Sequence, residues 1–181
     1  MRTPTSFALV FERHFASIHR YVYRRLGPDL AADVTAETFF VAFDRRAGYK
    51  PVHSDARPWL FGIASNLVRR HWRDELRWGK ACERMARETA HGETDGDRPL
   101  VPTDLDEEVR NSLRALSKRD RETLLLLAWA ELSYEEISLA LGVPIGTVRS
   151  RISRARRQIR KRLSLDATFI PKQREDYSER A

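Results

Sequence analysis

Apolar side chains recur every three or four residues along most of the first 80 residues, which is the spacing of amphipathic helices. The first stripe should end at Gly27 and Pro28, a pair that stops a helix. Its members are Phe7, Phe11, Ile18, Val22 and Leu26. A second stripe predicts a helix over about 29–43, and a third predicts a long helix that begins near Pro58. The pattern predicts a body of three or four helices.

A second helical body is predicted near the carboxyl end, with clearer starts. Ser117 with Asp120, and Ser133 with Glu136, fit capping boxes, in which a hydroxyl and a carboxylate satisfy free N–H groups. The run TLLLLAW between them is apolar on nearly all sides, which predicts a central core helix. Strand-like alternation is scarce throughout, so we expect an all-α fold of two small helical domains.

The segment 133–163 has the pattern of a helix-turn-helix. Gly142 can adopt the left-handed conformation that closes the first helix, and Val143-Pro144 begins the next. The apolar stripe of that next helix consists of Val148, Ile152, Ala155, Ile159 and Leu163. A helix, a glycine turn and a second helix are the arrangement that places a helix in the DNA major groove.

Cations fill the remaining positions of that second helix, together with two serines. These positions are Arg149, Ser150, Arg151, Ser153, Arg154, Arg156 and Arg157. Their mutual repulsion disappears when phosphates neutralise them. Gly146 and Thr147 lie in the first turn, where backbone N–H groups can approach a phosphate, whereas Arg149 and Arg154 can reach base edges. A basic helix alone is often only a solvated face, but in this setting it indicates DNA binding.

Composition and charge agree with a nucleic-acid partner. The 181 residues carry a net charge of +7 and an isoelectric point near 10.0. The charge is +6 over residues 1–90, −6 over 91–108 and +8 over 109–165. Because 91–108 is acidic, contains Gly and Pro and has little apolar periodicity, we expect a flexible linker there.

Other classes of function find little support in the sequence. The single cysteine, Cys82, cannot form an internal disulfide, and no apolar run is long enough for a signal peptide or a membrane span. His71, Cys82 and His91 lack the paired spacing of a zinc site, so no metal or other cofactor is expected. No phosphate-binding loop or nucleophile motif is present, and we therefore expect a cytoplasmic protein that is not an enzyme.

The order of segments resembles a bacterial RNA polymerase sigma factor of the extracytoplasmic function (ECF) group. The resemblance rests on AADVTAETFFVAF, ARPWLFGIASNLVRRHWR, the acidic linker, and LSKRDRETLLLL…SYEEISLALGVPIGTVRSRISRARRQIRKRL. It implies a region 2-like domain over 1–90, a linker over 91–108 and a region 4-like domain over 109–165. The remaining residues, 166–181, are expected to form a disordered tail.

The resemblance also implies partners and site residues. Asp33 and Glu37 would dock on the clamp helices of the largest subunit of core RNA polymerase, and the flap would be a further contact. Pro58 to Arg73 would face the melted minus-ten element, which is captured as single-stranded DNA. Its contact residues would be Asn66, Arg69, Arg70 and Arg73. The loop over 45–57 would receive a flipped base.

The carboxyl-terminal domain would bind the minus-thirty-five element as duplex DNA. The residues implied are Gly146, Thr147, Arg149, Ser150, Arg151, Arg154 and Arg157. The family also leaves room for an inhibitory partner, an anti-sigma factor. The sequence alone leaves open a stand-alone helix-turn-helix repressor or activator, and core packing or base stacking for the aromatics Trp59, Phe61, Trp72 and Trp78.

Overall fold

The structure is a computed structural model that describes residues 4–49, 55–87 and 105–163. Within these ranges it has seven helices and no strand, which confirms the all-α prediction. They are α1 (Pro4–Leu26), α2 (Pro28–Arg45), α3 (Arg57–Arg87), α4 (Glu107–Arg114), α5 (Lys118–Trp129), α6 (Tyr134–Leu141) and α7 (Ile145–Leu163). Outside the described residues lie most of the predicted linker, the predicted tail and part of the 45–57 loop. The same holds for His91 and for the side chains of Trp78 and Cys82.

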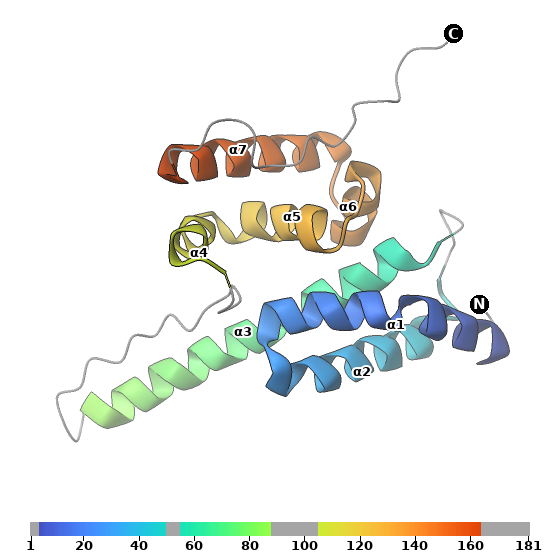
Figure 1. Cartoon of the computed structure of the whole chain (residues 1–181). Helices are drawn as coiled ribbons and strands as arrows, with labels where there is room; N and C mark the ends of the chain where they lie inside the picture. Colours follow the sequence, from blue (N-terminus) through green and yellow to red (C-terminus); the bar gives the residue numbers. More distant parts are fainter. Residues whose placement is uncertain (1–3, 50–54, 88–104, 164–181) are drawn as a thin grey trace, which may run out of the picture.

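The first body consists of α1, α2 and α3, which pack against one another (Figure 1). Pro28 begins α2 directly after Gly27, one residue before the predicted start, because proline suits the first position of a helix. Ile18, Val22 and Val34 are fully buried. Phe11, a member of the predicted apolar stripe, is instead 40% exposed, and its ring packs against the exposed Phe15 and the buried Phe39.

The second body consists of α4, α5, α6 and α7, and α5 is its central helix. Leu124, Leu125, Leu126 and Leu127 of α5 are all buried, as the apolar run predicts. Helix α4 was not predicted. It begins with Asp106 as N-cap, so Glu107 and Glu108 of the predicted linker form its first turn.

The two predicted helix starts are confirmed, but only one has a full capping box. Ser133 accepts from the Glu136 N–H while the Glu136 carboxylate accepts from the Ser133 N–H. Ser117 also accepts from the Asp120 N–H, at 3.1 Å, yet the Asp120 carboxylate binds elsewhere. Asp is one methylene shorter than Glu and reaches back less readily, so the capping box predicted at Ser117 is wrong.

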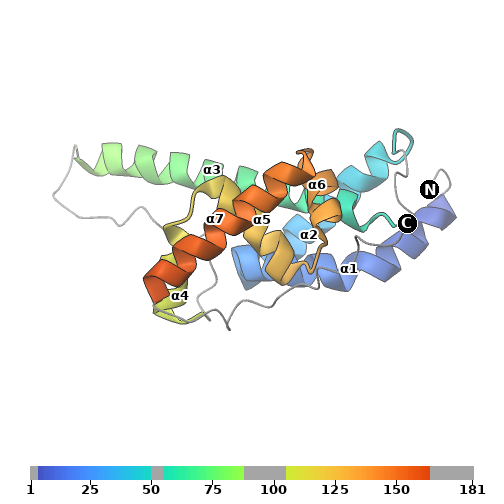
Figure 2. The ribbon, with the colours of Figure 1, turned by 90° about the horizontal axis from the view of Figure 1, so that it is seen from above.

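The two bodies pack directly on each other through α3 and α6. In Figure 1, α5 and α6 lie between α7 and the layer of α1, α2 and α3, and Figure 2 shows α7 crossing above α5. The buried side chains of both bodies belong to one continuous core. Trp59, Phe61 and Trp72 pack in or against that core, so core packing accounts for these three aromatics.

Gly62 allows the close approach of the two bodies. A Cβ atom at this position would lie 2.6 Å from the backbone oxygen of Ala140 in α6. Any residue other than glycine would therefore push α6 away from α3. Among the described residues, no helix is both long enough and apolar enough to cross a membrane.

Candidate nucleic-acid and polymerase interfaces

The turn between α6 and α7 fixes the orientation of the basic helix. Gly142 ends α6 in the left-handed conformation, with φ 62° and ψ 40°, and the Val143 N–H donates to the Ser138 carbonyl. Val148, Ile152 and Ala155 of α7 are buried, and α7 packs against α4, α5 and α6. This anchoring directs the other side of α7 outward.

The outward side of α7 contains most of the residues predicted to bind duplex DNA. Gly146, Arg149, Ser150, Arg154 and Arg157 are exposed, and Thr147 and Arg151 are half-buried. A Cβ atom at Gly146 would meet nothing within 4 Å, so the first turn of α7 is open to a ligand. The predicted residues thus share one helix and an accessible basic surface.

Arg154 differs from its neighbours on α7 because it has an acidic partner. Its Nη2 donates to Asp120 Oδ1 at 3.0 Å, and its Nε donates to Oδ2 at 3.4 Å. The carboxylate raises the pKa of Arg154, first by hydrogen bonding and then by its charge. Asp120, at the start of α5, therefore holds the Arg154 guanidinium at a defined place on the second body.

The residues predicted to bind the minus-ten element meet in one cleft. Asn66, Arg69, Arg70 and Arg73 of α3 form part of one wall, and Lys118, Arg121 and Glu122 of α5 form part of the other. The cleft has a volume of about 640 Å³. The Asn66 side-chain oxygen accepts a hydrogen bond from Arg69, which orients the amide beside the cations.

The predicted polymerase-binding pair lies on α2, with Asp33 exposed and Glu37 half-buried. Glu37 forms an ion pair with Arg70 of α3, with 2.5 Å between Oε1 and Nη2. The proposed polymerase surface on α2 and the proposed DNA surface on α3 are therefore connected by a direct contact that the sequence did not predict.

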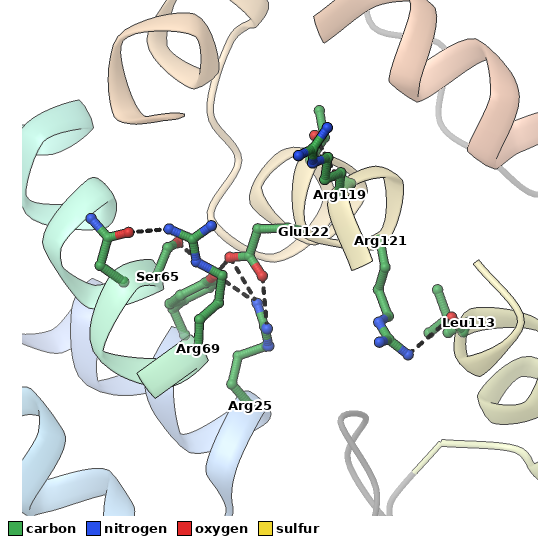
Figure 3. A network of polar contacts seen from close by, with 10 residues as sticks. Arg25, Ser65, Arg69, Leu113, Arg119, Arg121 and Glu122 are labelled. Atoms are coloured by element: carbon green, nitrogen blue, oxygen red, sulfur yellow. Dashed lines mark hydrogen bonds and ion pairs between the residues drawn. The ribbon is translucent and has the colours of Figure 1, made fainter. Parts of the chain in front are cut away.

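A buried polar network joins the two bodies (Figure 3). Arg25 of α1 donates from Nη2 to Glu122 Oε2 at 2.9 Å and from Nη1 to Oε1 at 3.2 Å. The Tyr21 hydroxyl donates to Glu122 Oε1 at 2.9 Å and lies 3.0 Å from the Ser65 hydroxyl of α3. We call Tyr21, Arg25, Ser65 and Glu122 the interdomain network.

The interdomain network holds its charges away from water. The side chains of Arg25 and Glu122 are 3% and 6% exposed. Burial alone would raise the pKa of Glu122, but the charge of Arg25 and hydrogen bonds from its partners keep this pKa below its ordinary range. Burial raises the pKa of Tyr21. Burial alone would lower the pKa of Arg25, but the charge of Glu122 keeps that pKa above its ordinary value. At neutral pH the network is a phenol between two fully charged groups.

Comparison with known proteins agrees with this architecture. The family model for sigma-70 region 2 matches residues 10–78, and the model for sigma-70 region 4 matches residues 106–159. The ECF RNA polymerase sigma factor EcfG of Rhodopseudomonas palustris is 30% identical over 146 residues, which cover 76% of this chain and 74% of EcfG. The chain belongs to the ECF sigma factors. Sigma factors are specificity subunits that bind core RNA polymerase and promoter DNA and direct transcription initiation.

Two further relatives match this sigma factor over nearly its whole length. RNA polymerase sigma factor YlaC of Bacillus subtilis is 27% identical over 168 residues, or 91% of this chain and 95% of YlaC. The fold resembles that of the sigma factor RpoE of Bartonella quintana, solved with the anti-sigma factor NepR. That likeness has a TM-score of 0.59 at 24% identity and covers 89% of this chain and 98% of the other.

Sequence reasoning missed the residues that connect the two halves of the sigma factor. Arg25 did carry a signal, since it is a cation on the apolar side of α1, one turn after Tyr21. Glu122 stands in the polar start of α5 and gave none. Within the described ranges, no group of three or more His, Cys, Asp or Glu side chains gathers as a metal site would require.

Proposed function

We propose that this sigma factor recognises the minus-thirty-five element as duplex DNA through α7 and captures the melted minus-ten element through α3. The observation that carries the proposal is the two-sided character of α7, whose apolar stripe is buried while the arginines on its other side are exposed. Arg149 is exposed, near the start of the helix, and suits a base contact. Arg157 and Arg160, further along, suit phosphates.

The cleft residues of α3 suit single-stranded DNA. Arg69, Arg70 and Arg73 would hold phosphates, while Asn66 offers an amide that can donate to and accept from a base edge. Because Arg69 already orients this amide, little side-chain freedom is lost on binding. Extrusion of a base costs a few kcal/mol, so a preformed polar pocket favours the base that it fits.

The polymerase contact is proposed for α2, where Asp33 and Glu37 lie one turn apart. Through this contact the chain would dock on the clamp helices of core RNA polymerase, and the flap would be a further contact. The chain would act in the cytoplasm as a non-catalytic specificity subunit. An anti-sigma factor is a further proposed partner, since the sigma factor RpoE of Bartonella quintana was solved with one.

The proposal is tested by transcription with reconstituted holoenzyme on promoters that carry every single-base change in the minus-thirty-five element. We expect Arg149→Ala to lose roughly 1–3 kcal/mol of discrimination at one position. Arg160→Ala is the matched control, because it should weaken all promoters alike and reduce the salt dependence by about one phosphate contact. Equal losses for both variants, with unchanged base preference, would show that α7 binds only phosphates.

A further inference from the structure

Asp120 is a buried carboxylate with a fixed position at the start of α5. Its side chain is 8% exposed, and its backbone N–H donates to the Ser117 hydroxyl at 3.1 Å. The residue therefore lies in the first turn of α5, where the free N–H groups of the helix stabilise a negative charge. Because α5 packs against α7, this anion lies beside the basic helix.

Arg154 meets this anion with only one edge of its guanidinium. The edge formed by Nε and Nη2 donates two parallel hydrogen bonds to the carboxylate of Asp120. A guanidinium carries five N–H donors in a rigid planar fork, so Asp120 does not use the second edge, which is formed by Nη1 and the other N–H of Nη2. Since the Arg154 side chain is 46% exposed, this second edge is available to a ligand outside the protein.

The residues around Arg154 on α7 leave room for duplex DNA. Ser150 lies one turn before Arg154, and Thr147 lies about one turn before Ser150, so the three residues share one side of the helix. Both neighbours are small, and a Cβ atom at Gly146 would meet nothing within 4 Å. Helical side chains lean toward the start of their helix, so Arg154 extends over the turn that contains Ser150. A base pair that approaches this turn would meet the second edge of the guanidinium.

The contact with Asp120 changes what Arg154 can recognise. An arginine without a partner is attracted by any phosphate, irrespective of the DNA sequence. The charge of Asp120 offsets that attraction, whereas the N–H groups on the second edge keep their direction. In the major groove, guanine presents N7 and O6 as two neighbouring acceptors, but adenine presents a donor in place of the second acceptor. A fixed fork of two donors therefore favours guanine.

We propose that Asp120 is a positioning residue for promoter recognition: it holds Arg154 so that the second edge of the guanidinium donates to N7 and O6 of one guanine in the minus-thirty-five element. The inference rests on the proposed function, because it requires α7 to lie in the major groove of that element. The restraint reduces the side-chain freedom that is lost on binding, and it keeps Arg154 from turning to a phosphate. Asp120 thus contributes base preference without a contact to DNA of its own.

The test measures DNA binding and transcription by holoenzyme with full-length variants, across every single-base change in the minus-thirty-five element. Arg154→Ala should lower the preference for guanine at one position roughly 5- to 150-fold. Asp120→Asn should lower the same preference roughly 2- to 10-fold. Its binding to promoters that lack this guanine should not fall, because the charge of Arg154 is no longer offset. The matched control is Glu108→Gln, which removes the same charge from an exposed site of α4 and should leave the preference unchanged.

The double variant separates positioning from a general loss of stability. In the Arg154→Ala background, Asp120→Asn should change the base preference no further, because Asp120 acts through Arg154. Equal losses at all positions, an unchanged preference in Asp120→Asn, or a preferred base other than guanine would overturn the inference. If Arg149→Ala and Arg154→Ala leave every preference unchanged, the proposed function fails together with the inference. Base preferences that depend on these arginines but not on Asp120 reject the positioning role alone.

A second measurement needs no substitution of Asp120, so the inference stays testable if Asp120→Asn folds poorly, which circular dichroism would reveal. In NMR spectra of the full-length free protein, the Nε–H of Arg154 should exchange with water more slowly than the Nε–H of the exposed Arg149. Arg154→Lys identifies the signal by its loss. Equal exchange at the two arginines would contradict the restraint by Asp120.

Discussion

Replacement of Gly62 by alanine should weaken the packing between the two bodies, although it should stabilise helix α3 itself. Gly62 is buried within α3, where alanine is the better helix former by about 0.5–1 kcal/mol. In the packed arrangement of the two bodies, however, the new methyl group would lie 2.6 Å from the Ala140 carbonyl oxygen. The backbone of α6 has to retreat by roughly 1 Å to regain an ordinary contact distance.

The expected size of the effect follows from this overlap. Overpacking of a well-filled core costs typically about 1–3 kcal/mol, and the obstacle here is backbone, which adapts less easily than a flexible side chain. We therefore expect the population with separated bodies, relative to the population with packed bodies, to rise roughly 5- to 150-fold.

The assay is small-angle scattering on full-length Gly62→Ala, combined with hydrogen exchange of the amides in α6. The matched control is Gly146→Ala, another helical glycine, whose Cβ atom would meet nothing within 4 Å. We expect expansion and faster α6 exchange for Gly62→Ala and neither change for Gly146→Ala. Unchanged compaction together with a higher melting temperature for Gly62→Ala would refute the reasoning, because the helix gain would then outweigh the clash.

Two further predictions concern the first body. Asp33→Lys should weaken co-purification with core polymerase, whereas the control Glu12→Lys, at an exposed position of α1, should not. Asp33 is chosen because Glu37→Lys would also break the ion pair with Arg70. Normal co-purification of Asp33→Lys would remove Asp33 from the interface. Burial lowers the pKa of His14 below its ordinary value of 6.5, even though its Nε2 lies 2.9 Å from Asp55. The unfolded chain then binds more protons, so the His14 contribution to the free energy of unfolding should be complete above pH 6.5 and fall as the pH drops through 6.5 toward the lower folded-state pKa. In urea titrations, the free energy of unfolding should fall less between about pH 7.5 and about pH 5.5 in His14→Gln than in the wild type. Equal falls in the two proteins would contradict this assignment.

The sequence by itself determined the helices whose signals are local. Periodic apolar stripes located α1, α2 and α3, and the Ser133 cap with Gly142 bounded α6, because each signal lies within a few residues of the structure that it specifies. The basic side of α7 was predictable for the same reason, since a buried stripe leaves its other residues facing outward. The short helix α4 was not predicted, because its acidic first turn has the same composition as the linker before it.

Only the tertiary structure decided how the two halves meet. Three ion pairs join residues that are far apart in sequence: Arg25 with Glu122, Arg70 with Glu37 and Arg154 with Asp120, at separations of 97, 33 and 34 residues. Because the chain is rich in charged residues, the sequence offers many alternative partners for each of them. Gly62 likewise gave no sign of its role, because the space that it leaves is filled by Ala140 from the other body. Periodicity records which side of a helix avoids water, whereas the choice of partner depends on distances that exist only after the bodies have packed together.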